Sequence, residues 1–256
     1  MSTASIKKED TKKTWNPWVA VVVALFALLG SQVIIGLVLS LYPTIRGWNS
    51  IQANNWLNNS IIAQFIFVML AEALAISIVY LYLRRYKGAL KEIGLKKPKW
   101  IEPLYGLMAL PVYLVIYFFI VNVSIKLFPN LNTGQKQQLG FNNPHGIIEL
   151  ILTFISLVIL PPIAEEILFR GLVYTSLRKI MPFIWAMIFT SAIFAIGHLP
   201  EGGSSGPLYI AAIDTFSLSL VLVYLREKTG SLYASMTLHA LKNLIAFSAL
   251  FVLHLT

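Results

Sequence analysis

The chain has 256 residues, of which 57% are hydrophobic and only 12% are charged, whereas about a quarter of the residues in a soluble domain are charged. This composition excludes an ordinary soluble fold and predicts a polytopic membrane protein. The net charge of +9 does not indicate a nucleic-acid partner, because the basic residues lie in short loops, where they act as topology signals. The chain has no cysteine, which excludes disulfides, thiol nucleophiles and cysteine-ligated zinc.

Seven apolar runs follow a polar N-terminal segment that carries Lys7, Lys8, Lys12 and Lys13. Most runs have about the 20 residues that a membrane-spanning helix needs, so we expect an all-α bundle of about seven transmembrane helices. Trp15 and Trp18, at the start of the first run, are expected to be anchors at the membrane interface. The runs cover roughly residues 18–42, 61–83, 103–125, 148–175, 182–198, 208–225 and 232–255.

Basic residues fall in alternate loops, at residues 84–100, 178–179 and 226–228. By the positive-inside rule these loops are cytoplasmic, which places the N-terminus inside the cell and the C-terminus outside. The compact chain with short loops and no organelle address is typical of a bacterial cell membrane, where lipid is a partner. No particular oligomeric state is predicted.

The predicted organisation has three parts. Residues 1–17 form a basic cytoplasmic N-terminus, residues 18–144 form three transmembrane helices, and residues 145–256 form a core of four helices. Apart from Glu72, the charged side chains that lie inside apolar runs belong to this core.

The fourth run carries two adjacent carboxylates and an arginine. As one straight helix it would be about 42 Å long, more than the ~30 Å hydrocarbon core, so Pro161 and Pro162 are expected to break it. Glu165 would then lie in the first turn of the inner piece, where the helix dipole favours a carboxylate. Glu166 and Arg170 are four residues apart and should form an ion pair, which leaves Glu165 free for chemistry. A polar plug without catalysis explains this stretch equally well.

Two later runs add polar side chains at a similar depth. Phe194 and His198 end the fifth run, and His239 and Asn243 lie four residues apart in the seventh. At ~1.5 Å per residue from the proposed cytoplasmic ends, Glu165 and these histidine and asparagine side chains lie about 12–24 Å deep. Because three helices place such groups at a similar depth in the membrane, a functional site is a better explanation than isolated interhelical hydrogen bonds.

Three other intramembrane residues receive a structural interpretation. Lys242 is expected to pack against a neighbouring acid such as Asp214, and Glu72 is expected to make an interhelical hydrogen bond. Each of them could instead line the site.

The chain resembles the CPBP family of intramembrane proteases, which is the CAAX-protease and bacteriocin-processing family, also called Abi. The resemblance covers roughly residues 145–255, and the first 140 residues carry no matching motif. It rests on three motifs in this order on successive apolar helices: Glu165-Glu166-x-x-x-Arg170, Phe194-x-x-x-His198 and His239-x-x-x-Asn243.

The resemblance implies hydrolysis of a peptide bond in a membrane-associated peptide or protein. It implies that Glu165 and His198 activate a water, with Glu166 and Arg170 in support, and that His239 and Asn243 stabilise the oxyanion. This chemistry is reasonable for these residue types, because a carboxylate near a histidine is a competent base and His and Asn supply donors. In bacteria the implied substrates are peptide pheromone or bacteriocin precursors, or the activity serves self-immunity.

A catalytic zinc ion is an open alternative, with Glu165, His198 and His239 as its three protein ligands. The metal-free water is slightly favoured, because the chain lacks His-Glu-x-x-His and the residue four positions after His239 is an amide. Two other functions also stay open. One is a non-enzymatic immunity or peptide-binding membrane protein, and the other is a proton-coupled transporter with Glu165, His198 and Asp214 as its relay. The transporter is less favoured because no internal repeat is visible.

Overall fold

The computed structural model describes residues 15–135, 137, 140–142 and 144–254. Lys7, Lys8, Lys12 and Lys13 of the predicted basic N-terminus lie outside the described residues. The expected all-α architecture is confirmed: the described residues contain no strand, and seven of their helices are long and apolar enough to cross a membrane. The elements are α1 Pro17–Ile45, α2 Ser50–Asn59, α3 Ile61–Arg85, η1 Leu90–Ile93, α4 Ile101–Met108, α5 Leu110–Leu127, α6 Gly146–Phe154, η2 Ile155–Ile159, α7 Leu160–Glu165, η3 Glu166–Val173, α8 Tyr174–Leu177, α9 Phe183–Gly197, η4 Leu199–Ser205, α10 Tyr209–Thr229, α11 Tyr233–Phe247 and η5 Ser248–Val252.

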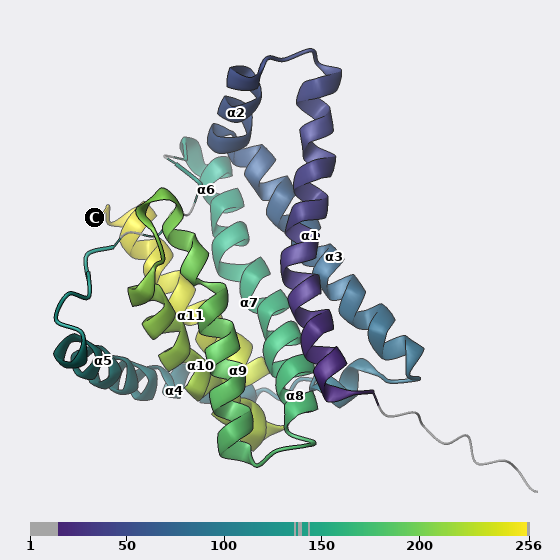
Figure 1. Cartoon of the computed structure of the whole chain (residues 1–256), viewed down its shortest axis with the longest axis vertical. Coiled ribbons are helices and arrows are strands. Elements are labelled where there is room, and N and C mark those ends of the chain that lie inside the picture. The colour runs from purple at the N-terminus through teal and green to yellow at the C-terminus, as the bar shows by residue number, and fades with distance from the viewer. Residues whose placement is uncertain (1–14, 136, 138–139, 143, 255–256) are drawn as a thin grey trace, which may run out of the picture.

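Helices α1 and α3 form a hairpin joined by the short helix α2 (Figure 1). Both helices bury small side chains, and small residues let neighbouring helix backbones approach closely. Close packing of this kind replaces the hydrophobic driving force, which is absent between helices in lipid. The buried small residues are Ala20, Ala24, Ala27 and Ser31 on α1, and Ala63, Ala71 and Ala75 on α3.

The fourth span is continuous from Gly146 to Leu177, so the expected break at Pro161 and Pro162 is wrong. The wide π-helical turn η2 comes directly before the prolines, and its closing bond runs from the Leu160 N–H to the Ile155 carbonyl. A π turn adds room at the point where a proline ring would otherwise clash with the carbonyl four residues earlier. Glu165 consequently lies at the end of α7, inside a continuous helix, rather than in the first turn of a new one.

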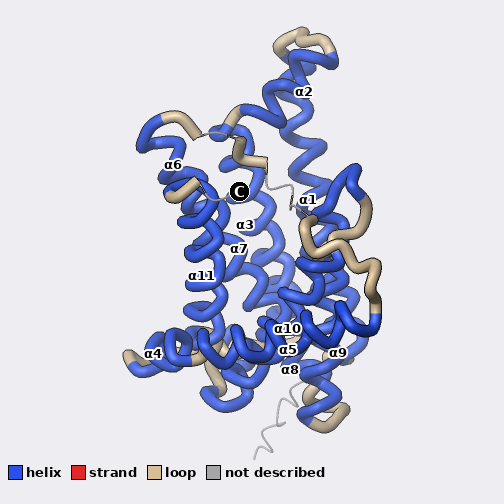
Figure 2. Tube along the Cα trace, turned by 90° about the vertical axis from the view of Figure 1, so that its left-hand side faces the viewer, coloured by secondary structure: helices blue, strands red, loops and turns tan. Residues whose placement is uncertain are grey.

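The third span, formed by α4 and α5, lies across the lower part of the bundle (Figure 2). Its Ala109 and Tyr113 pack against Leu218 and Leu222 of α10. Helix α10 is the most enclosed span: 50% of the residues in its apolar 18-residue stretch are buried, against 28% or less in the other spans. The first three spans therefore contact the last four in two places. Helices α4 and α5 pack against α10, and α1 and α3 pack against the fourth span.

The start of α1 is locked to the end of the fourth span. Trp15 is only 4% exposed, and its indole Nε1 donates to the Ser176 hydroxyl at 2.8 Å. The Lys179 ammonium lies 3.3 Å from the centroid of the Trp15 ring. The expectation that Trp15 is an interfacial anchor is wrong, because its ring is buried against α8, whereas Trp18 is 60% exposed.

Candidate active site

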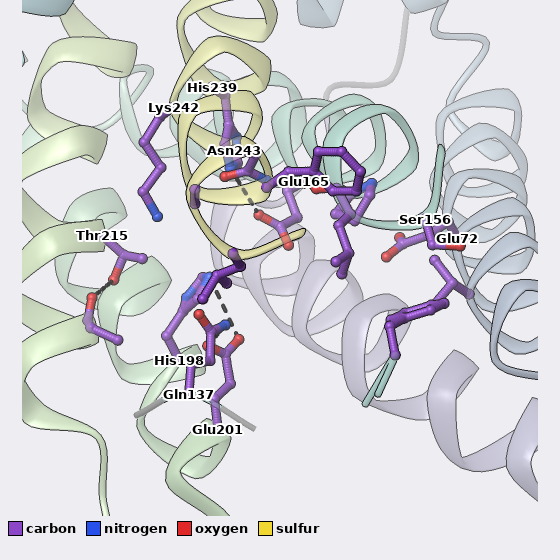
Figure 3. A pocket seen from close by; sticks show the side chains of 18 of the residues that line it. Glu72, Gln137, Ser156, Glu165, His198, Glu201, Thr215, His239, Lys242 and Asn243 are labelled. Atoms are coloured by element: carbon purple, nitrogen blue, oxygen red, sulfur yellow. Dashed lines mark hydrogen bonds and ion pairs between the residues drawn. The ribbon is translucent and has the colours of Figure 1, made fainter. Parts of the chain in front are cut away.

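The structure brings all four predicted site residues to one cavity of about 390 Å³. Glu165 reaches it from α7, His198 from the end of α9, and His239 and Asn243 from α11. Figure 3 shows the Glu165 carboxylate and the His198 ring on facing walls of this space. Its volume is within the usual range for small-molecule sites, about 300–1,000 Å³.

The ion pair predicted between Glu166 and Arg170 is present. Arg170 Nη1 lies 2.9 Å from Glu166 Oε1, and both side chains are completely buried. The guanidinium also lies 4.3 Å from the centroid of the Phe194 ring. Because a lone buried charge is very costly, each partner makes the burial of the other tolerable.

His239 lies between the two adjacent glutamates. Its Nδ1 is 3.0 Å from Glu166 Oε1, and its Nε2 is 3.6 Å from Glu165 Oε2. A carboxylate bound to an arginine only accepts, so Nδ1 carries the proton, and Nε2 carries a second one only when the ring is a cation. The histidine that lies beside the Glu165 carboxyl group is His239, at 3.6 Å and without a hydrogen bond, although His198 was the expected partner.

His198 presents its other ring nitrogen to the cavity. Its Nδ1 lies 2.8 Å from the Phe194 carbonyl oxygen, which can only accept, so Nδ1 is the protonated nitrogen. The Nε2 lone pair is then free, and Glu201 Oε1 lies 3.8 Å from Nε2. In this tautomer Nε2 can take a proton from a water in the cavity.

Asn243 is tied to the proline-containing helix. Its Nδ2 donates to the Leu157 carbonyl oxygen at 3.0 Å. The helical donors for that carbonyl would be the backbone nitrogens of Pro161 or Pro162, and neither carries a hydrogen. Asn243 satisfies this carbonyl with one amide hydrogen and keeps a second amide hydrogen for another acceptor.

Sequence reasoning missed one carboxylate in the cavity wall, Glu201, and gave a place there for Glu72 only as the alternative. Glu201 follows His198 by three residues, and Gln137 Nε2 donates to its Oε2 at 2.7 Å. Glu72 lines the cavity from α3, and among the described residues it does not form the expected interhelical hydrogen bond. The spacing of three residues between His198 and Glu201 could have indicated that Glu201 belongs to the site. Glu201 was overlooked because it lies in a Gly-rich stretch that resembles a plain turn.

The predicted contact between Lys242 and Asp214 is confirmed, with Nζ and Oδ2 at 2.9 Å. Both residues line the cavity. The Tyr113 hydroxyl donates to the other oxygen of Asp214. The third span therefore supports the cavity wall through Tyr113, although no motif in the sequence of this span indicates such a role.

The possible zinc ligands do not fit a metal ion in this arrangement. Among the described residues there is no group of three His, Cys, Asp or Glu side chains that could hold one. The Nδ1 atoms of His198 and His239 are each bound to another acceptor, and their Nε2 atoms face different carboxylates, Glu201 and Glu165. A three-ligand centre would require these side chains to move.

Comparison with known proteins finds a match in the C-terminal part of the chain. A family model described as Type II CAAX prenyl endopeptidase Rce1-like matches residues 147–245. Searches of curated proteins and of solved structures gave no match. The matched stretch runs from α6 into α11, so it contains all four predicted site residues and leaves α1 to α5 outside.

Proposed function

On the premise that residues 147–245 belong to the Rce1-like family, within the CAAX-protease and bacteriocin-processing proteins, we propose that this membrane protein is an endopeptidase. It hydrolyses a peptide bond in a membrane-associated peptide or protein. The observation that carries the proposal is the convergence of Glu165, His198, His239 and Asn243 on one cavity (Figure 3). In this proposal residues 145–256 are the catalytic core and residues 18–144 support it.

Water activation falls to Glu165 and His198. The two side chains face the same space from different helices, and His198 Nε2 offers a lone pair because Nδ1 is bound to Phe194. A water held between Glu165 and His198 loses a proton to His198 Nε2 as the water oxygen attacks the peptide carbonyl carbon. When the C–N bond breaks, the same proton passes to the leaving amine.

Oxyanion stabilisation falls to Asn243 and His239. Asn243 has one amide hydrogen left after its bond to Leu157. His239 faces the cavity with Nε2, which donates only when the ring carries a second proton, and Nε2 and Nδ1 lie 3.6 and 3.0 Å from the carboxyl groups of Glu165 and Glu166. Donors aimed at the developing oxyanion are usually the largest single contribution to such catalysis.

A membrane-associated substrate suits the position of the cavity among apolar helices. In a bacterial cell membrane, with the N-terminus inside and the C-terminus outside, precursors of peptide pheromones or bacteriocins are substrates of this kind. Self-immunity to such a peptide is another outcome of the same cleavage.

The test compares Glu165→Gln with the wild-type protein, both purified into lipid nanodiscs. Peptides that accumulate in cells carrying the Glu165→Gln variant are identified by mass spectrometry and offered to each protein. We expect cleavage by the wild-type protein and none by Glu165→Gln at equal membrane expression. Glu149→Gln is the matched control, because Glu149 lies on α6 of the same span and its carboxylate binds the His145 N–H rather than lining the cavity.

Normal cleavage by Glu165→Gln would refute the proposal. Biological protection that survives in Glu165→Gln without any cleavage would instead support the non-enzymatic, peptide-binding alternative. Equal loss of cleavage in the Glu149→Gln control would show that the effect of Glu165→Gln is structural.

A further inference from the structure

A second cavity, of about 540 Å³, lies between the start of α4 and the end of α10. It shares no residue with the candidate active site. Figure 1 shows α4 beside the lower part of α10, and the two helices are in contact. Its α4 wall lies outside the stretch that matches the protease family, so the proposed peptidase chemistry does not account for this cavity.

The polar end of this cavity carries an excess of positive charge. Lys99 and Lys228 both line it, and neither forms an ion pair with a carboxylate among the described residues. The carboxylate in the wall, Glu102, is only 3% exposed and is already engaged. Its Oε2 accepts from the Ser231 hydroxyl at 3.1 Å and from the Lys99 backbone N–H at 3.2 Å. The two ammonium groups are therefore available to an anionic ligand.

The rest of the cavity is apolar and opens to the outside of the bundle. Ala109 and Leu225 line it and are buried, whereas Ile101, Met108 and Tyr224 are 44%, 64% and 48% exposed. Lysine and tyrosine at the ends of spans lie at the level of lipid headgroups. An occupant that matches both parts has an anionic head and an apolar tail.

We infer that this cavity binds an anionic phospholipid. The phosphodiester lies between Lys99 and Lys228, the Tyr105 and Tyr224 hydroxyls lie near the headgroup, and an acyl chain follows the exposed apolar side chains of α4 and α10. Basic pockets between transmembrane helices bind acidic lipid headgroups in this manner. Because one wall comes from α4 and the other from α10, the bound lipid links the N-terminal helices to the core.

The experiment uses the full-length protein after delipidation in a neutral detergent. Phosphatidylglycerol, phosphatidylcholine or inorganic phosphate is added, and binding is measured by native mass spectrometry and by the melting temperature. The test variant is Lys99→Gln with Lys228→Gln. The matched control is Lys91→Gln with Lys97→Gln, which removes the same charge from exposed lysines that lie in the basic loop of Lys99 but do not line the cavity.

We expect phosphatidylglycerol to bind and to raise the melting temperature of the wild-type protein and the control, because a ligand that binds only the folded state stabilises it. The Lys99→Gln, Lys228→Gln variant should bind it at least tenfold more weakly while melting at the wild-type temperature without lipid. Equal binding of phosphatidylcholine, equal weakening in the control, or full stabilisation by inorganic phosphate alone would each overturn the inference. If the test variant does not fold, Tyr105→Phe with Tyr224→Phe replaces it, and unchanged affinity in that variant would overturn the inference too.

Discussion

Replacing Asn243 by alanine should both slow hydrolysis and destabilise the fourth span. The Asn243 side chain donates to the Leu157 carbonyl oxygen at 3.0 Å. No backbone donor can replace it in the helix, because the residues four and five positions after Leu157 are Pro161 and Pro162. The alanine variant leaves this carbonyl without a protein partner.

The size of the effect follows from the surroundings of Leu157. An unsatisfied buried acceptor costs about 1–3 kcal/mol. Leu157 lines the cavity, so water can reach part of its carbonyl, and we expect the lower range, about 1–2 kcal/mol. Since each kcal/mol lowers the melting temperature of a chain of this size by about 2–4 °C, the expected fall is about 2–8 °C. Loss of one oxyanion donor should also lower kcat by about 10²–10³-fold.

Thermal unfolding in nanodiscs measures the first effect, and peptide cleavage measures the second. Asn122→Ala is the matched control, because its Nδ2 also donates to a carbonyl, that of Phe118 at 2.7 Å, but on the exposed helix α5. There the backbone ladder satisfies the carbonyl, and the expected change is below about 0.5 kcal/mol. A melting temperature of Asn243→Ala equal to that of Asn122→Ala would refute this account of the fourth span.

Four further predictions test the rest of the site. Glu166→Gln should cost about 3–5 kcal/mol of stability, because the Arg170 charge stays buried without its partner; combining it with Arg170→Met should recover part of the melting temperature, and no recovery would contradict a charge effect. His198→Ala should lower kcat by about 10²–10⁴-fold, the usual contribution of a positioned general base. Glu201→Gln should lower kcat by a smaller factor with unchanged KM and melting temperature, and a larger loss than in His198→Ala would show that Glu201 has a role of its own. A chelator should leave cleavage unchanged, since the donors do not form a three-ligand group; stoichiometric zinc whose removal reversibly abolishes cleavage would contradict this expectation.

The sequence alone determined the all-helical class, the seven apolar spans and the pairs that lie four residues apart. These features depend on helix geometry and on the thickness of the bilayer, so composition and spacing are sufficient to predict them. The Glu166–Arg170 ion pair belongs to this class, because both side chains lie on one face of one helix. Counting residues inward from the basic loops also indicated that Glu165, His198 and His239 lie at a similar depth.

Only the tertiary structure decided how these helices meet. The rotation of each helix about its own axis determines that Glu165 lies beside His239 and that His198 faces Glu201. Packing also lets the fourth span stay continuous through Pro161. The π turn leaves room for the proline ring, and Asn243 of α11 donates the hydrogen bond that the proline nitrogen cannot give to Leu157. These contacts join residues that are tens of positions apart, and apolar periodicity carries no information about such pairings.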